Sequence, residues 1–351
     1  MKKSFLKIGD NIIGDNKPVF IIAEAGVNHN NKLKMALDLV DIATQAGANA
    51  IKFQTFRAED VVVATEQMAP YQKKNTRKSA TQLKMLKSLE LNDSFYAPIV
   101  KRCKQKKILF LSTPHGGFQS VDFLQKLHIP AFKFGSGDLA NIPVLEYAAR
   151  LKKPMILGTG MATMIEVRDA VMAIKRAGNS KIVALQCTTN YPCPFDEVNL
   201  VAMQAMSKEL DVLIGYSDHT LGSQASIIAT ALGACVIEKH FTLNKKLSGP
   251  DHQASLDPKE FKDFVEDIRS TSVIMGSEIK RPTSSEMSII KKIRKSIVSQ
   301  RFIHKDEIFS NQNISIKRPG TGLPPKKYYY IIGKKAKRDI KKDSIISFYD
   351  F

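Results

Sequence analysis

Six charged or imidazole side chains follow five short apolar runs in this 351-residue sequence. The residues in this position are Glu24, Lys52, Lys133, His219, Glu238 and His240. Two ammonium groups with hydroxyl-bearing neighbours suit a small ligand that carries both a phosphate and a carboxylate. Gly135, Gly137 and Gly160 would let backbone amides approach such an anion.

The two histidines, His219 and His240, end consecutive strands of the predicted sheet. Two neutral imidazoles a strand apart can hold one divalent ion and leave positions open for substrate and water. Hydrogen-bonded structural histidines are the alternative, but the adjacent strand ends favour a metal. Two nitrogens without a thiol suit manganese, magnesium or iron better than structural zinc. Four further histidines, of which only the first could line the site, are expected at the surface or on helices: His29, His115, His128 and His304.

The two glutamates, Glu24 and Glu238, end the first and last predicted strands, which are neighbours in a closed barrel. Carboxylates in this position can transfer protons. They can equally form ion pairs with lysines of the same site. The residues alone leave both roles open.

Eight short apolar runs alternate with amphipathic stretches over most of the chain. Apolar strands between helices indicate a parallel sheet covered by helices. Eight such units favour an α/β fold of the (β/α)8, or TIM-barrel, type over an open doubly wound sheet. No GxGxxG motif follows the first strand, so a dinucleotide-binding fold is disfavoured. The predicted strands are Val19–Ala23, Ala50–Phe53, Ile108–Leu111, Ala131–Phe134, Met155–Leu157, Ile182–Leu185, Val212–Ile214 and Cys235–Ile237.

Polar, hydroxyl-bearing or charged residues end every one of these strands. A single polar strand end would carry little information, but eight in succession indicate a functional rim. Barrel enzymes build their active sites at the carboxyl ends of the strands. Besides the six residues above, the strand ends include Gln54, Thr113, Ser136, Asp138, Thr189, Tyr191 and Ser217.

The composition changes near Arg281-Pro282-Thr283, where short β-rich pieces with turn signals replace the strand–helix pattern. We therefore expect a barrel domain over residues 1–280, a linker over 281–292 and a small β-rich domain over 293–351. A module of this size is small for independent stability. We expect it to dock on the barrel or on a partner subunit.

The formal net charge of +19 raises the question of a nucleic-acid surface. The lysines are scattered along the chain, and the adjacent Tyr328, Tyr329 and Tyr330 are not spaced as a base-stacking platform. A nucleic-acid partner is therefore disfavoured, and part of the charge can attract an anionic substrate. No apolar stretch is long enough for a membrane span, and the basic start lacks the apolar run of a signal peptide. We expect a cytoplasmic protein whose four cysteines are reduced and mostly buried.

The motifs at the strand ends resemble those of the sialic acid synthases. The resemblance covers nearly the whole chain in the same order, and the tail resembles the small antifreeze-like (SAF) domain of those enzymes. The segments that carry it are Ile22-Ala23-Glu24-Ala25-Gly26-Val27-Asn28-His29, Lys52-Phe53-Gln54-Thr55, Ser112-Thr113-Pro114, Gly215-Tyr216-Ser217-Asp218-His219, Ile237-Glu238-Lys239-His240-Phe241-Thr242, Ser248-Gly249-Pro250-Asp251-His252 and Lys317-Arg318-Pro319-Gly320-Thr321-Gly322.

The resemblance implies a domain-swapped homodimer that condenses phosphoenolpyruvate with an N-acylated mannosamine in the presence of Mn²⁺ or Mg²⁺. His219 and His240 would bind the metal. Glu24, Asp138 and Glu238 would be the catalytic carboxylates, while Gln54 and Asp251 would bind the sugar together with Arg318 of the partner subunit. Phosphoenolpyruvate would be held by Lys52, Thr113, Lys133, Ser136, Thr189, Tyr191 and Ser217.

Three positions depart from the family pattern. Gly158 stands where a serine is frequent, so no phosphate-binding hydroxyl is expected there. Asp138 replaces a frequent glutamate and shortens the side chain by one methylene. Asn190 replaces a frequent glutamate before Tyr191.

The predicted reaction is N-acetylneuraminate synthesis, in which phosphate leaves by C–O cleavage and Glu24 or Asp138 assists the addition of water. The motifs Ser248–His252 and Ala69-Pro70-Tyr71-Gln72 indicate the neuraminate or legionaminate branch of the family. Legionaminic acid synthesis from 2,4-diacetamido-2,4,6-trideoxymannose is the alternative. An aldolase with a Schiff base on Lys133, and a basic nucleic-acid- or glycan-binding protein, are the alternatives of other classes.

Overall fold

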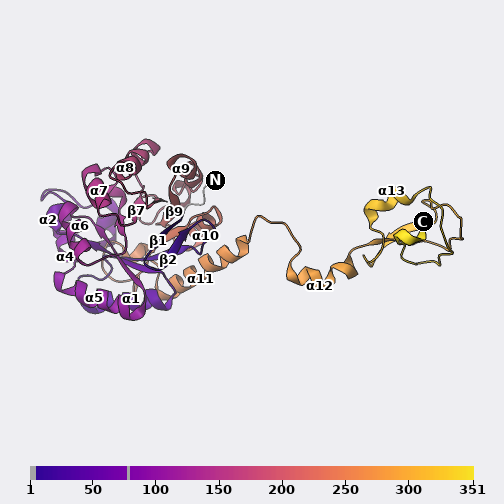
Figure 1. The fold of residues 1–351 in the computed structure, drawn as a ribbon. Helices are drawn as coiled ribbons and strands as arrows, with labels where there is room; N and C mark the ends of the chain where they lie inside the picture. Colours follow the sequence, from indigo (N-terminus) through magenta and orange to yellow (C-terminus); the bar gives the residue numbers. More distant parts are fainter. Residues whose placement is uncertain (1–4, 77–79) are drawn as a thin grey trace. The chain divides into compact units, whose positions relative to one another are not determined.

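The computed structural model of the protein describes residues 5–76 and 80–351. The chain divides into two compact units, Met1–Gly276 and Ser277–Phe351 (Figure 1). The basic start of the chain, residues 1–4, lies outside the description. No helix among the described residues has both the length and the apolar character that crossing a membrane requires.

The first unit is an eight-stranded parallel barrel, as the sequence predicts. One continuous ladder runs from β5 through β4, β3, β10, β9, β8 and β7 to β6, and β5 lies beside β6 without a ladder between them among the described residues. The barrel is therefore nearly closed. Its strands are β3 (Phe20–Gly26), β4 (Ala50–Thr55), β5 (Leu109–Pro114), β6 (Phe132–Phe134), β7 (Met155–Gly158), β8 (Ile182–Gln186), β9 (Leu213–Asp218) and β10 (Val236–His240).

Helices surround these strands (Figure 1). Local sequence fixes where several of them begin: Thr163 and Glu166 form a reciprocal capping box at the start of α8, and Asp257 and Glu260 do the same for α11. The helices of the unit are α1 (Leu33–Gln45), α2 (Ala58–Val61), α3 (Pro70–Thr76), α4 (Gln82–Leu89), α5 (Asp93–Lys106), α6 (Gly117–Lys126), α7 (Ile142–Arg150), α8 (Met164–Arg176), α9 (Ala202–Leu210), α10 (Gln224–Ala231) and α11 (Pro258–Met275).

The amino-terminal end of the barrel is packed with apolar side chains. Phe20, Ile22 and Leu111 belong to a buried cluster that also contains Leu6 and Ile8 of a hairpin, β1 (Phe5–Ile8) and β2 (Asn11–Gly14). The sequence analysis did not predict this hairpin. Its apolar side chains fill the end of the barrel opposite the strands' carboxyl ends.

Strand alternation decides which side chains reach the interior at the other end. In β3, Phe20 and Ile22 belong to the interior cluster, whereas Ile21 and Ala23 pack with the outer layer of helices. Successive strand residues face opposite sides, so Glu24 continues the inward row. The same alternation in other strands directs inward Lys52, Gln54, Thr113, Lys133, Ser217, Glu238 and His240.

The second unit has its own apolar core, which includes Ile297, Ile303, Phe309 and Ile346. Its two-stranded antiparallel sheet, β11 (Ser296–Ser299) and β12 (Ile314–Lys317), occupies the predicted β-rich segments. Helix α12 (Ser284–Ile293) lies where the linker is expected, and α13 (Tyr328–Ile331) contains the three adjacent tyrosines. All four cysteines are free and buried, as predicted.

Candidate active site

The side chains of two lysines and two glutamates meet inside the carboxyl-terminal end of the barrel. Lys52 Nζ lies 2.8 Å from Glu24 Oε2 and 3.8 Å from Glu238 Oε2, and Lys133 Nζ lies 3.1 Å from Glu238 Oε1. Each side chain is at most 5% exposed. Both lysines point into the barrel, as the strand alternation requires. We call these four residues the mouth cluster.

Hydroxyl groups complete the mouth cluster. Lys52 Nζ donates a hydrogen bond to Thr113 Oγ1 at 2.9 Å, and Ser217 Oγ donates to Glu238 Oε1 at 3.0 Å. Glu238 Oε2 is buried and accepts no hydrogen bond among the described residues. Buried polar atoms are normally hydrogen-bonded, so this oxygen marks a place for a ligand or water.

The two glutamates differ in their electrostatic environment. Burial raises the pKa of Glu24 to about 7, although the ammonium of Lys52 opposes the rise. Burial acts in the same sense on Glu238, but Lys133 and Lys52 outweigh it and hold the pKa of that carboxyl at about 2. Glu24 can therefore exchange a proton near neutral pH, whereas Glu238 stays an anion between the lysines.

The two histidines predicted as metal ligands also lie together, with ring centroids 5.6 Å apart. His219 Nδ1 is 2.7 Å from the carbonyl oxygen of Thr188, so this nitrogen carries the hydrogen and Nε2 keeps its lone pair. His240 Nδ1 is buried without a partner among the described residues. The ring of Tyr191 packs against both imidazoles, with its centroid 4.2 Å from that of His219 and 5.6 Å from that of His240.

Both imidazoles are suited to a cation. Burial lowers the pKa of His219 to about 4 and that of His240 well below its ordinary value, so both rings are neutral at pH 7. Two neutral nitrogen donors fit a divalent ion. No group of three histidine, cysteine or carboxylate side chains that could hold a metal occurs among residues 5–76 and 80–351. Substrate or water would therefore supply the remaining ligands of an ion bound here.

Ser136 and Thr189 lie beside two glycines, Gly158 at the end of β7 and Gly160 after it. The Gly160 amide donates to Ser136 Oγ at 3.0 Å, and a Cβ atom on Gly160 would collide with Thr189 Oγ1. Thr189 Oγ1 is another buried oxygen without a partner among the described residues. A Cβ atom on Gly158 would lie 3.1 Å from both the amide nitrogen and Oγ of Ser136. A serine at this position would therefore require Ser136 to shift by a few tenths of an ångström.

The predicted sugar-binding residues of the first unit adjoin the same site. A Cβ atom on Gly26 would lie 3.2 Å from Glu24 Oε1, 3.5 Å from His240 Cε1 and 3.6 Å from Gln54 Nε2, so these side chains meet over one glycine. Burial raises the pKa of Asp251 to about 6, and Lys52 opposes this rise. Arg318 belongs to the second unit, where its Nε donates to the carbonyl oxygen of Ile293.

Two of the remaining histidines differ from an ordinary surface residue. His29 is fully buried on the loop after β3. His115 is not a free surface residue, because its Nδ1 lies 2.8 Å from Asp138 Oδ2. The strand-end rule would have selected His115, which directly follows Ser112-Thr113-Pro114. The sequence analysis also missed Cys187, whose Sγ lies 3.1 Å from Ser136 Oγ and accepts from the Gly160 amide.

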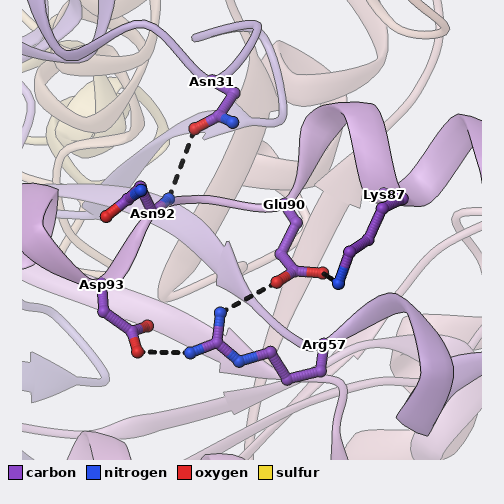
Figure 2. Close-up of a pocket in the computed structure, with 6 residues that line it drawn as sticks. All are labelled: Asn31, Arg57, Lys87, Glu90, Asn92 and Asp93. Carbon is purple, nitrogen blue, oxygen red and sulfur yellow. Dashed lines mark hydrogen bonds and ion pairs between the residues drawn. The ribbon is translucent and has the colours of Figure 1, made fainter.

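A second charged cluster lines a pocket of about 310 Å³ outside the mouth (Figure 2). Arg57 contacts both Glu90, at 2.8 Å, and Asp93, and Lys87 lies 3.3 Å from Glu90. We call these four residues the rim cluster. Every charge in it is paired with another, and the sequence analysis did not predict it.

Comparison with known proteins identifies the family. Residues 39–280 match the NeuB family and residues 294–351 match the SAF domain. The chain is 44% identical over 332 residues to the N,N'-diacetyllegionaminic acid synthase of Campylobacter jejuni, which covers 94% of this chain and 99% of that protein. It is 33% identical to the human N-acetylneuraminate-9-phosphate synthase, over 95% of this chain and 93% of that protein.

Solved structures agree with this assignment. The N-acetylneuraminic acid (sialic acid) synthetase of Leptospira borgpetersenii superposes with a TM-score of 0.74 at 33% identity, over 82% of this chain and 95% of that one. The spore coat polysaccharide biosynthesis protein SpsE of Bacillus subtilis superposes with a TM-score of 0.67 at 35% identity, over 99% of both chains. The chain is therefore an enzyme of the NeuB family that carries a carboxyl-terminal SAF domain, as the sequence resemblance predicted.

Proposed function

We propose that this enzyme condenses phosphoenolpyruvate with an N-acylated mannosamine to form a nine-carbon sugar acid and inorganic phosphate. The observation that carries the proposal is the mouth cluster, in which two buried ammonium groups lie at the same barrel end as two neutral imidazoles. Buried lysines of this kind match a ligand that carries several negative charges. Relatives named N,N'-diacetyllegionaminic acid synthase and N-acetylneuraminate-9-phosphate synthase support it.

In this proposal, phosphoenolpyruvate occupies the side of the mouth formed by β4 to β9. Lys52 and Lys133 neutralise its phosphate and carboxylate, and Glu238 holds both ammonium groups in position. The orphaned Thr189 Oγ1 becomes hydrogen-bonded when the anion is present. The further proposed contacts are Thr113, Ser136, Tyr191 and Ser217.

His219 and His240 would hold a divalent cation, Mn²⁺ or Mg²⁺, which when bound supplies positive charge to the carbonyl oxygen of the open-chain sugar. Glu24 and Gln54 lie beside His240 at Gly26, so we assign them to the sugar end of the site together with Asp251. A Glu24 carboxyl with a pKa of about 7 can give a proton to the former aldehyde oxygen. Glu238 cannot take this role, because its pKa lies far below neutrality.

The bond changes follow from the two substrates. C3 of phosphoenolpyruvate bonds to the aldehyde carbon, and the aldehyde oxygen takes a proton to become a hydroxyl. Water then adds to C2, and the bond between C2 and the bridging oxygen breaks to release phosphate. The lysines that held the anionic substrate stabilise the charge of the departing phosphate.

Phosphate release from phosphoenolpyruvate, N-acetylmannosamine and Mn²⁺ tests the proposal, with product mass as the second readout. Phosphoenolpyruvate labelled with ¹⁸O at the bridging oxygen should give labelled phosphate, because the C–O bond breaks. Unlabelled phosphate, or turnover that is trapped by borohydride as a lysine adduct, would contradict this mechanism. The Lys34→Met variant is a matched control, because the side chain of Lys34 is 86% exposed.

The identity of the sugar is a finer proposal, for which two acceptors compete. N-acetylmannosamine is the first candidate. The 2,4-diacetamido-2,4,6-trideoxy sugar is the second, and it is favoured by relatives named N,N'-diacetyllegionaminic acid synthase at 44% and 43% identity. A site that hydrogen-bonds a substrate group can discriminate strongly against an analogue that lacks it. Comparison of kcat/KM for the two sugars therefore identifies the substrate.

We also propose a domain-swapped homodimer in which Arg318 of one subunit reaches the sugar's N-acyl group in the other. In support, helix α12 carries Met287, Ile289 and Ile293 at least 48% exposed, an apolar face suited to a subunit contact. Mixing the inactive Lys133→Met and Arg318→Ala proteins should restore activity in hybrid dimers. Sedimentation as a monomer, or no restored activity after subunit exchange, would reject the swap.

A further inference from the structure

His115 and Asp138 form a carboxylate–imidazole pair that the family resemblance did not assign. His115 follows β5, and Asp138 ends a short 3₁₀ turn, Ser136–Asp138, that follows β6. His115 Nδ1 lies 2.8 Å from Asp138 Oδ2. The side chains are 27% and 16% exposed, so the pair is accessible yet partly shielded from water.

The imidazole lies against the anion-binding side of the mouth. A Cβ atom on Gly135 would lie 3.0 Å from His115 Cε1, 3.7 Å from His115 Nε2 and 3.9 Å from Thr113 Cγ2. Gly135 stands between Lys133 and Ser136 in the chain. The ring therefore covers the backbone that joins two proposed contacts of phosphoenolpyruvate. Glu24 belongs to the sugar end, beside His240.

The hydrogen bond fixes the chemistry that the imidazole can perform. A carboxylate at Nδ1 holds the hydrogen on that nitrogen and leaves Nε2 to exchange a proton. An imidazole exchanges protons near neutral pH, where an ordinary aspartate is a weak base. A further charged side chain near this loop is Asp60 of α2, whose Oδ2 lies 3.6 Å from a Cβ atom built on the next residue, Gly116.

We propose that His115 is a further catalytic residue, with Asp138 as its positioning residue, and that His115 transfers the proton of the water that adds to C2. This inference rests on the proposed function. As the water oxygen bonds to C2, Nε2 takes one proton. The same proton passes to the bridging oxygen while its bond to C2 breaks and phosphate leaves. The remaining proton of the C2 hydroxyl goes to Glu24, which has given its own to the aldehyde oxygen.

The test compares phosphate release by the full-length wild type with that of His115→Asn, Asp138→Asn and a control, His128→Asn, between pH 5.5 and 9. Asparagine at 115 can still donate to Asp138 but cannot titrate. We expect kcat to fall about 100-fold with little change in the KM for phosphoenolpyruvate, since general acid–base catalysis contributes at least this much. The acid limb of the pH profile should vanish. His128 is exposed in the loop before β6, at the opposite end of the barrel, and its replacement should change nothing.

Two further readouts separate catalysis from a structural role. Free imidazole should restore part of the activity of His115→Ala, and Asp138→Asn should lower kcat with little change in the KM for phosphoenolpyruvate, because the imidazole loses the acceptor that holds its hydrogen on Nδ1. A wild-type kcat and profile in His115→Asn would overturn the proposal. So would lost activity with an unchanged pH profile and no imidazole rescue. If the wild type turns over neither sugar, the proposed function is wrong, and the role of His115 and Asp138 is wrong with it. If the wild type is active and His115→Asn is equally active, only the role of His115 and Asp138 is wrong.

Discussion

The mouth cluster and the rim cluster of the same barrel each contain two cations and two carboxylates, yet their surroundings are opposite. In the mouth, the four side chains are between 2% and 5% exposed. In the rim pocket, Arg57, Lys87 and Asp93 are about half exposed, at 47%, 54% and 57%, and only Glu90 is largely covered, at 10%. Identical formal charge is thus held in two different dielectric environments.

The difference indicates which cluster exists for chemistry. Removing charges from water costs more than their pairing usually returns, so a buried ion network is weak evidence for a stabilising role. The mouth also contains Glu238 Oε2, which has no hydrogen bond among the described residues, whereas both oxygens of Glu90 are engaged by Arg57, Lys87 and the Ala58 amide. We infer that the charges of the mouth cluster serve to bind substrate, whereas those of the rim cluster hold the neighbouring segments in place.

Breaking the mouth pair should give the largest effect. We expect Lys133→Met to lower kcat at least 1000-fold, because a charge aimed at the reacting anion is lost, and to destabilise the fold by about 3–5 kcal/mol, because Glu238 loses its nearest counterion. Phosphate release and urea unfolding measure the two quantities. The Lys133→Met/Glu238→Gln double variant should regain stability without activity. A double variant as unstable as the single one would show that the mouth charges are structural after all.

The effect of a bound cation on stability is expected to be the second largest, and it should depend on the histidine pair and not on the rim cluster. Mn²⁺ at about 100 times its Kd should stabilise the wild type by about 2.7 kcal/mol, since a ligand that binds only the folded state shifts the equilibrium. The His219→Asn variant should not be stabilised by Mn²⁺. It should also lack the metal-dependent activity, which in the wild type is the activity lost on addition of EDTA. Thermal unfolding with and without Mn²⁺ measures it. Arg57→Gln, in the rim, should keep the full shift; an equal shift in His219→Asn would exclude the histidine pair as the ion's site.

The dependence of stability on pH should have opposite signs for Asp251, beside the mouth cluster, and for Glu90 of the rim cluster. Burial raises the pKa of Asp251, beside the mouth, to about 6, above its unfolded value, so the folded state loses stability as the pH rises through this range. Asp251→Asn should therefore gain on the order of 1–3 kcal/mol relative to wild type above pH 6 and little near pH 4. Urea unfolding at pH 4.5 and pH 8 measures the difference.

Glu90 provides the matched rim measurement. Burial raises its pKa, but the hydrogen bonds from Arg57, Ala58 and Lys87 outweigh burial and lower it. A carboxyl whose pKa is lowered on folding stabilises the fold at pH values above its unfolded pKa. This stabilisation is lost as the pH falls through the folded pKa. Glu90→Gln should therefore be less stable than wild type at pH 8, with a deficit that shrinks below pH 4.5. The same sign of pH dependence in both variants would contradict the opposite pKa shifts of Asp251 and Glu90.

The sequence predicted the barrel and its inward residues because both follow from strong local rules. Short apolar runs between helices specify a parallel barrel, and strand alternation then directs Lys52, Lys133 and Glu238 to one interior. Neighbouring strands bring Glu24 opposite both Lys52 and His240 in register. The roles of these residues stay predictions, whereas the fold and the family are confirmed.

The parts that escaped prediction depend on contacts between segments without a repeating pattern. The hairpin β1–β2 is only eight strand residues long, and its role depends on an interior that the rest of the chain builds. The rim cluster joins Arg57 to Glu90 and Asp93, which lie more than thirty positions away at the end of α4 and the start of α5. The pair of His115 with Asp138 requires knowledge that the ends of β5 and β6 lie side by side.

Removing the rim arginine should give the smallest effect. Arg57→Gln is expected to destabilise the fold by about 1 kcal/mol or less, because partly exposed ion pairs contribute little and Glu90 keeps Lys87 and the Ala58 amide. The loss should shrink further at high salt, which screens exposed charges. Urea unfolding at two salt concentrations measures it, and phosphate release should match the wild type. A large loss of activity would instead connect the rim to the reaction, since Arg57 follows β4, the strand that carries Lys52.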